Sequence, residues 1–281
     1  MAEPLPLSRE ALDDFITRTL AEDVGTGDVT AEATIPETAR FRARIAARET
    51  LVVAGLPVAI AIVKRLAPDA IVEVLVEDGR TARPGDTVVR IEGPARALLT
   101  AERSALNILQ HLSGVATLTR SYVDLIAGTG AKLLDTRKTI PGLRVLEKYA
   151  VKMGGGTNHR MGLYDAVLIK DNHLAVAGGV TAAVNACRAR TGLRVQVECD
   201  TLDQAREAIA AGADSLLLDN MTLDQLRDAV GFSSIPLEAS GGVNLQTIRA
   251  IAETGVDYIS VGRLTQSAPA IDLGMDFEDL G

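Results

Sequence analysis

The stretch that decides the fold is Lys132–His173, KLLDTRKTIPGLRVLEKYAVKMGGGTNHRMGLYDAVLIKDNH. Two short apolar runs, 133–134 and 166–169, each stop at ionisable residues. A buried strand that ends in charged groups is typical of strands whose C-terminal ends carry an active site. The stretch also brings Arg137, Lys138, His159, Arg160 and Lys170 into one region, up to five cationic groups. Such a cluster predicts a ligand with more than one anionic group, because arginine binds carboxylate or phosphate bidentately and lysine adds a point charge.

The same pattern of apolar run, polar end and helical segment continues to the end of the chain. The expected parallel strands are Lys132–Asp135, Ala166–Lys170, Leu193–Glu198, Ser215–Asp219, Ile235–Glu238 and Tyr258–Val261. Functional side chains at nearly every strand end favour a barrel over an open doubly wound sheet, which uses only the ends beside its switch point. We therefore expect an α/β fold with an incomplete barrel of about seven strands, residues 113–266.

The first part of the chain has a mixed pattern. Residues 1–112 alternate helical and strand-like segments, which predicts an N-terminal α/β sandwich domain to which residues 267–281 return. Two helices are expected at its end, from Pro94 to about His111 and from about Val115 to Ile126. Arg103 lies within the first of these helices.

Composition limits the classes of function. The chain has 281 residues and a net charge of −8, which argues against a general nucleic-acid surface. It has only two cysteines, Cys187 and Cys199, which predicts a reducing compartment rather than a disulfide framework. No signal peptide or membrane span is recognised, so we expect a cytoplasmic protein without membrane partners.

Two further groups complete the candidate site. Glycine-rich loops follow the last two strands, and backbone N–H groups there can bind a phosphate; they contain Ser240, Gly241, Gly242, Val261, Gly262 and Arg263. Glu198 and Asp219 end neighbouring strands, where they could act as an acid/base pair, hold Mg²⁺ with ligand phosphates, or stabilise a developing positive charge. Cys199 alternates away from Glu198 and is expected in the core.

The chain resembles the quinolinate phosphoribosyltransferase family. The resemblance rests on DTRKTIPGLRVLEKYAVKMGGGTNHRMGLYDAVLIKDNH and on EDVGTGDVT, ERSALNILQHLSGVATLT, LLLDNM, EASGG and the late SVG, in this order. It implies transfer of phosphoribose from 5-phosphoribosyl 1-diphosphate to quinolinate with decarboxylation, giving nicotinate mononucleotide, diphosphate and CO₂ for NAD biosynthesis. It also implies a homodimer or higher homo-oligomer with shared active sites, and no organic cofactor.

The resemblance assigns roles residue by residue. It implies that Arg137, Lys138, His159, Arg160 and Lys170 hold the quinolinate carboxylates, with Arg103 reaching in from a neighbouring subunit. Thr136 is expected to bind substrate. Glu198 and Asp219 would face the ribose and Mg²⁺, directly or indirectly, and with Lys138 and Lys170 they are the expected catalytic residues. Ser240, Gly241, Gly242, Val261, Gly262 and Arg263 would bind the donor phosphate. Arg263 and Gln266 depart from a pattern common in bacterial members, so the details of phosphate binding stay open.

Three alternatives remain at this point. One is a paralogous group linked to molybdenum transport, which resembles the family but whose chemistry is not established. Another is a Schiff-base lyase that uses Lys170 as its amine. The last is a non-catalytic binding protein for a phosphorylated metabolite, against which the two strand-end carboxylates count.

Overall fold

The structure is a computed structural model that describes residues 4–277. It divides into two compact units, and each is described by itself. Within the described residues, unit 1 comprises 4–119, Val145–Gly155 and 267–277, and unit 2 comprises Arg120–Arg144 and Gly156–Gln266. The boundary expected between residues 112 and 113 stays a prediction, and this division differs from it by placing 113–119 and Val145–Gly155 in unit 1.

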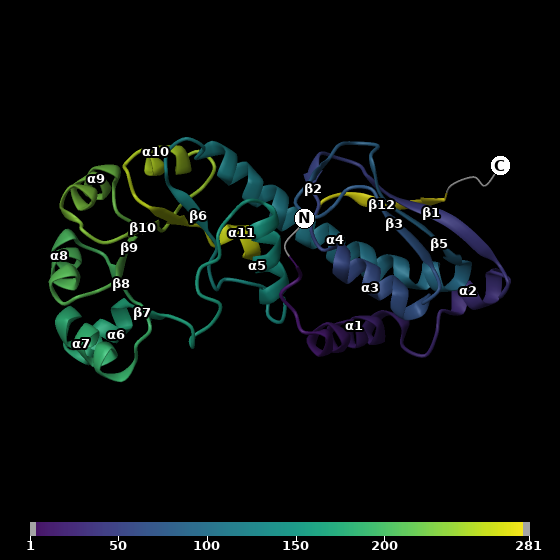
Figure 1. Cartoon of the computed structure of the whole chain (residues 1–281), viewed down its shortest axis with the longest axis horizontal. Helices are drawn as coiled ribbons and strands as arrows, with labels where there is room; N and C mark the ends of the chain where they lie inside the picture. The colour runs from purple at the N-terminus through teal and green to yellow at the C-terminus, as the bar shows by residue number, and fades with distance from the viewer. Residues whose placement is uncertain (1–3, 278–281) are drawn as a thin grey trace. The chain divides into compact units, whose positions relative to one another are not determined.

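Unit 1 is built on an antiparallel sheet with the strand order β12-β1-β5-β3, and helices lie against the sheet (Figure 1). Its strands are β1 (Arg40–Ala47), β2 (Leu51–Val52), β3 (Ile71–Val74), β4 (Thr81–Ala82), β5 (Thr87–Pro94) and β12 (Leu273–Phe277), with β2 paired to β4. Its helices are α1 (Arg9–Val24), α2 (Val29–Thr34), α3 (Leu56–Leu66), the first part of α4 (Ala95–Leu125) and nearly all of α5 (Arg144–Met153). The late strand β12 pairs antiparallel with β1.

The two faces of this sheet differ in chemistry. Ala43 and Ile45 of β1 are buried, whereas Arg42 of the same strand pairs with Glu92 of β5 at 2.6 Å on the other face. Alternation along a strand places apolar side chains on one face and charged ones on the other. The α/β sandwich that the sequence predicts is confirmed by this arrangement.

A single helix, α4, replaces the two helices expected between Pro94 and Ile126. It runs unbroken for 31 residues. Gly114 lies in its middle because Pro269 and Ala270 pass so close that a side chain there would collide with the Pro269 carbonyl. Glycine at this position therefore marks a close backbone approach and not a helix end.

Unit 2 contains a six-stranded parallel sheet with the order β6-β11-β10-β9-β8-β7. Its strands are β6 (Lys132–Leu134), β7 (Val167–Ile169), β8 (Val195–Cys199), β9 (Ser215–Asp219), β10 (Leu237–Ser240) and β11 (Tyr258–Ser260). Helices lie along the outside of the strands (Figure 1): α6 (Asp171–Ala177), α7 (Val180–Arg190), α8 (Leu202–Ala210), α9 (Leu223–Phe232) and α10 (Ile248–Ala252). The short helix α11 (Arg263–Gln266) follows the end of β11.

The barrel is incomplete, as predicted, but within residues 4–277 it has six strands and not seven. Its open edge lies between β6 and β7, which are the two ends of the strand order. A parallel bridge from Leu134 to Thr157 extends the β6 edge by one position. Among the described residues, no helix has the length and hydropathy needed to cross a membrane.

Candidate active site

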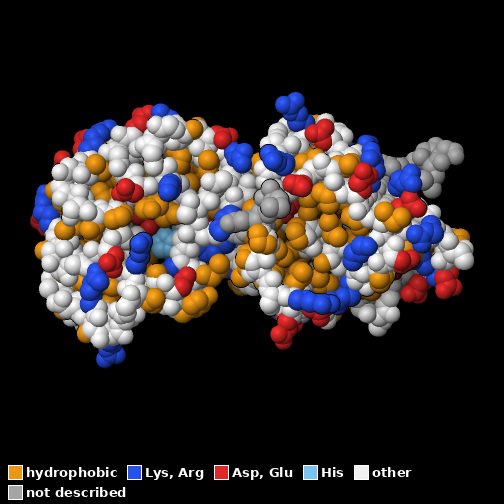
Figure 2. Space-filling view, in the orientation of Figure 1, with side chains coloured by type: hydrophobic (Ala, Val, Ile, Leu, Met, Phe, Trp, Pro, Cys, Tyr) orange, Lys and Arg blue, Asp and Glu red, His pale blue; other side chains and the backbone are white. Residues whose placement is uncertain are grey.

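The C-terminal ends of the unit 2 strands surround two adjoining cavities. The first, called the basic cavity, measures about 350 Å³ and is lined by Thr136, Arg137, Lys138, His159, Arg160, Leu168, Lys170, Glu198, Leu217, Asp219, Glu238, Ser240 and Ser260. Figure 2 shows basic and acidic side chains gathered around a histidine on this unit. The second, called the glycine cavity, measures about 260 Å³ and shares Thr136, Lys138, Ser240 and Ser260 with the first.

The loop that follows α5 is held in place by Asp135. This fully buried carboxylate accepts hydrogen bonds from the His159 backbone N–H at 2.8 Å and from Asn158 Nδ2 at 2.6 Å. Asp135 directly follows β6, so it ties the residues before Arg160 to the end of a strand. It therefore positions the basic cavity rather than lining it.

Arg160 is a half-buried cation of the basic cavity. Its Nη1 donates to the Ala166 carbonyl at 3.1 Å. Burial and the neighbouring positive charge of Arg137 lower the pKa of the Arg160 guanidinium, while the Asp165 carboxylate raises it. Two like charges held this close favour an anion between them. An anionic ligand would offset both the cost of burying the Arg160 charge and the repulsion between Arg160 and Arg137.

His159 uses both of its ring nitrogens within the protein. Its Nδ1 accepts a hydrogen bond from the Arg160 backbone N–H at 2.7 Å. The proton of the neutral ring therefore lies on Nε2, which is 3.2 Å from Gln196 Oε1 and 3.2 Å from Glu238 Oε2. The basic cavity thus holds four cationic side chains, Arg137, Lys138, Arg160 and Lys170, with His159 in its wall.

Lys170 and Glu198 form an ion pair on the ends of β7 and β8. The Lys170 Nζ donates to Glu198 Oε2 at 2.9 Å, and the two side chains are 45% and 14% exposed. This pair uses the ammonium form of the lysine, whereas a Schiff base needs the neutral amine. The geometry therefore favours a charge-binding role for Lys170 over the lyase alternative.

The carboxylates of Glu198 and Asp219 both line the basic cavity. Asp219 Oδ2 accepts a hydrogen bond from Asn220 Nδ2 at 2.6 Å. Among the described residues, no three acidic, cysteine or histidine side chains gather as a metal cage. Two carboxylates in one cavity nevertheless fit Mg²⁺, which is held in proteins by one or two carboxylates together with substrate phosphates and water.

Tight backbone approach explains two glycines of the glycine cavity. Gly241 has a φ of 92°, and a side chain there would lie 2.8 Å from the Asn220 backbone nitrogen. At Gly262 a side chain would lie 2.8 Å from Lys138 Cδ. Glycine is therefore required at Gly241 by the backbone, whereas at Gly262 it leaves room for the Lys138 side chain beside the loop.

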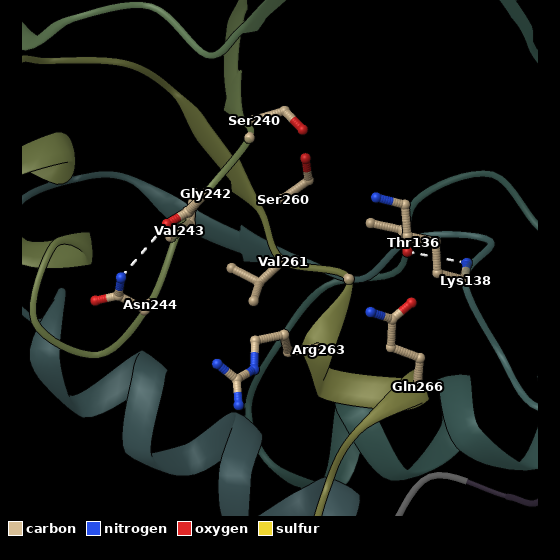
Figure 3. Close-up of a pocket in the computed structure, with 12 residues that line it drawn as sticks. Thr136, Lys138, Ser240, Gly242, Val243, Asn244, Ser260, Val261, Arg263 and Gln266 are labelled. Carbon is tan, nitrogen blue, oxygen red and sulfur yellow. Dashed lines mark hydrogen bonds between the residues drawn. The ribbon is translucent and has the colours of Figure 1, made fainter.

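Arg263 and Gln266 extend in different directions within the glycine cavity (Figure 3). The Gln266 amide extends toward Thr136 and Lys138, whereas the Arg263 guanidinium extends away from them toward a helix. Burial raises the pKa of Tyr122 in α4, and the positive charge of Arg263 lowers it, which places Arg263 near that ring. Gln266 is therefore the better placed of the two for a ligand that contacts Lys138.

Comparisons with known proteins agree with this geometry. Family models for the N-terminal and C-terminal domains of quinolinate phosphoribosyl transferase match residues 28–113 and 115–276. The chain belongs to the quinolinate phosphoribosyl transferase family. A nicotinate-nucleotide pyrophosphorylase [carboxylating] from Mycobacterium leprae is 44% identical over 95% of this chain and 97% of its own. A nicotinate-nucleotide pyrophosphorylase structure from Francisella tularensis has a TM-score of 0.94, 40% identity and 98% coverage of both chains.

The structure of this quinolinate phosphoribosyl transferase family member brings together nearly all of the predicted site residues. Every one of them lines one or both cavities except Arg103, which is exposed on α4 in unit 1. Their roles stay predictions, because the comparisons bear on the family and not on single side chains. The relatives named here are called pyrophosphorylases, which favours that activity over the molybdenum-linked alternative.

Sequence reasoning left several side chains out of this family member's site, among them Ser260 of both cavities and the bonded pair Gln196 and Glu238. Gln196 donates to Glu238 Oε2 at 2.8 Å, and Glu238 lines the basic cavity. Strand alternation was the signal that could have found them, since Gln196 shares a face of β8 with Glu198, and Glu238 shares a face of β10 with Ser240. The expected core position of Cys199 is confirmed, and burial, with the charges of Asp200 and Glu198, raises the pKa of its thiol to about 12.

Proposed function

We propose that this protein transfers the phosphoribosyl group of 5-phosphoribosyl 1-diphosphate to quinolinate and releases diphosphate and CO₂, giving nicotinate mononucleotide. The observation that carries the proposal is the junction of the two cavities at Thr136, Lys138, Ser240 and Ser260. Four cations in one cavity suit the two carboxylates of quinolinate. Glycine loops in the other suit the phosphate of the donor. The acceptor nitrogen and the donor ribose would then meet at the shared residues.

The reaction follows from this placement. As the bond from the anomeric carbon to the diphosphate oxygen breaks, its electron pair leaves with the diphosphate and the ribose becomes cationic. Glu198 and Asp219, which line the basic cavity, stabilise that charge. The pyridine nitrogen forms the new bond to the anomeric carbon and becomes positively charged.

Loss of CO₂ completes the reaction. The bond from the ring to the adjacent carboxylate breaks, and its electron pair stays on the ring carbon beside the cationic nitrogen. A proton from solvent then replaces the carboxylate. The protein contributes position and charge, with no covalent enzyme intermediate.

Mg²⁺ is proposed to enter with the diphosphate of the donor. Glu198 and Asp219 are the side chains of this chain that would hold it, directly or through water. When bound, the ion neutralises charge on the leaving diphosphate. No organic cofactor is proposed for this reaction.

The direct test is an assay with quinolinate, 5-phosphoribosyl 1-diphosphate and Mg²⁺ that follows CO₂ and diphosphate. Nicotinate serves as the control acceptor, because it lacks the carboxylate that is lost. We expect CO₂ and diphosphate in equal amounts from quinolinate and little turnover of nicotinate. Absence of nicotinate mononucleotide under these conditions would refute the proposal.

A homodimer with shared active sites is proposed as the working assembly. Figure 2 shows a broad area of hydrophobic side chains on the face of unit 1 that carries α3 and α4, a feature typical of interaction surfaces. If Arg103 serves the site of a partner, mixing inactive Arg103→Ala and Lys170→Ala chains restores part of the activity in hybrid dimers. Hybrids that form and stay inactive would refute the shared site. The cytoplasmic location stays a prediction, with which the free thiols Cys187 and Cys199 agree.

A further inference from the structure

Glu238 is a buried carboxylate at the wall of the basic cavity to which the proposed function gives no role. Its side chain is 3% exposed. Oε2 accepts from Gln196 Nε2 at 2.8 Å and lies 3.2 Å from His159 Nε2. Oε1 is buried without a hydrogen-bond partner. A buried carboxylate oxygen without a partner destabilises the folded state. The presence of Glu238 at this position is therefore not explained by stability.

The contacts of Glu238 lead directly to a cation of the cavity. Glu238 and Gln196 together face His159 Nε2 and fix the proton there. The other nitrogen, Nδ1, is thereby left as an acceptor, and it receives the Arg160 backbone N–H at 2.7 Å. The plane of the His159 ring and the backbone at Arg160 are therefore set by the same hydrogen bonds.

We propose that Glu238 is a positioning residue: with Gln196 it locks His159 as the Nε2–H tautomer, and through His159 it fixes Arg160 for a carboxylate of the acceptor. The inference rests on the proposed function for its substrate. It gives Glu238 no contact with the reacting atoms. Because Arg160 lies in the basic cavity and outside the lining of the glycine cavity, the effect falls on the acceptor and not on the donor.

The test compares Glu238→Leu with Glu238→Gln. Leucine removes the acceptor for Gln196 and His159, whereas glutamine keeps an oxygen in the place of Oε2. We expect Glu238→Leu to raise the KM for quinolinate by on the order of 100-fold, since small misplacements of substrate-binding groups have effects of this size. The KM for 5-phosphoribosyl 1-diphosphate should stay unchanged, and Glu238→Gln should behave as wild type.

A spectroscopic measurement tests the same claim without turnover. The chain has three histidines, so His111→Gln and His173→Gln variants assign the ¹⁵N imidazole signals of His159. Wild type and Glu238→Gln should show the Nε2–H tautomer alone, and Glu238→Leu should show a mixture. If Glu238→Leu does not fold, Gln196→Leu replaces it, because that change also removes contacts to Glu238 and His159.

Asp78→Asn in unit 1 is the matched control, a buried carboxylate whose loss should leave both KM values unchanged. An unchanged tautomer and an unchanged quinolinate KM in the leucine variants would overturn the inference. An equal rise in the quinolinate KM for Glu238→Gln and Glu238→Leu would also overturn it. The charge of Glu238, and not its hydrogen bonds, would then be what matters. If wild type makes no nicotinate mononucleotide, the proposed function fails, and the imidazole spectra alone decide the positioning role.

Discussion

Asp78 in unit 1 and Glu238 in unit 2 are both buried carboxylates, but their hydrogen bonding differs. Asp78 Oδ2 accepts from Tyr149 Oη at 2.7 Å and from the Gly55 backbone N–H at 2.9 Å, and Oδ1 accepts from the Leu56 N–H at 3.2 Å. Both of its oxygens are satisfied, and they cap the start of α3. Glu238 leaves Oε1 without a partner.

The difference separates a carboxylate that serves the fold from one that serves a site. A fully bonded buried group stabilises one arrangement of the chain. A partly bonded group beside a cavity costs stability and is retained for what it does to its neighbours. We therefore expect loss of the Asp78 carboxylate to affect unfolding and loss of side chains that line the basic cavity to affect turnover.

The largest effect is expected for Arg137→Ala and Lys170→Ala, which remove cations from the basic cavity. Loss of one preorganised charge at a reacting site typically lowers turnover by about 100- to 1000-fold. Neither change should alter the free energy of unfolding much, because neither side chain belongs to the core. Steady-state kinetics and urea unfolding measure the two quantities.

Arg227→Ala is the matched control for these variants. Arg227 is exposed and pairs with Asp224 one helical turn away, and surface pairs of this kind contribute little to stability. Near-normal turnover of Arg137→Ala or Lys170→Ala would contradict the assignment of the basic cavity.

Asp78→Asn should show the opposite pattern. Asparagine cannot accept from Tyr149, Gly55 and Leu56 at once, so the free energy of unfolding should fall by about 1–3 kcal/mol. Kinetic constants should stay at wild-type values. A change in KM without loss of stability would remove the distinction between the two carboxylates.

The pH dependence sharpens this prediction. Burial raises the pKa of Asp78 above its ordinary value of 3.8, and the bonds from Tyr149, Gly55 and Leu56 oppose that rise. Because the folded pKa is the higher one, the stabilising contribution is fully present below the unfolded pKa and is lost as pH rises through the folded pKa. The stability deficit of Asp78→Asn should therefore grow as pH is lowered from neutral to about 4. Urea unfolding at both pH values checks the sign.

The smallest effects are expected in the glycine cavity. Gln266→Ala should raise the KM for the donor by up to about tenfold, the equivalent of one hydrogen bond. Arg263→Ala should have a smaller effect, because its guanidinium extends away from Lys138. A larger rise in the donor KM for Arg263→Ala than for Gln266→Ala would contradict this ranking.

Much of the fold could be predicted because its signals are local. Apolar runs ending in polar residues located all six strands of unit 2. Ser8 caps the start of α1 through its side chain, which accepts from the Ala11 N–H, and such a cap is a local signal as well. The long α4 was predicted as two helices, because only the tertiary approach of Pro269 explains Gly114.

The sequence predicted the site residues that lie at strand ends. It did not predict the hydrogen bonds between side chains of different strands. Lys170, Glu198 and Asp219 end strands, and parallel topology brings such ends together. The bond from Gln196 on β8 to Glu238 on β10 spans the intervening β9, which local pattern does not encode. The tautomer of His159 depends on that hydrogen bond, so the sequence alone could not determine it.

The path of the chain through α5 has a consequence for dissecting the molecule. Val145–Gly155 belongs to unit 1, although the residues on both sides of it belong to unit 2. Tyr149 is buried there and bonds Asp78. A fragment cut to begin at Arg120 would carry this helix without the surroundings that bury it, directly between the segments that hold Arg137 and Arg160. The part of the chain that carries the two cavities therefore cannot be cut out as one continuous segment. Shortened versions of the protein should be obtained by removing residues from the termini only.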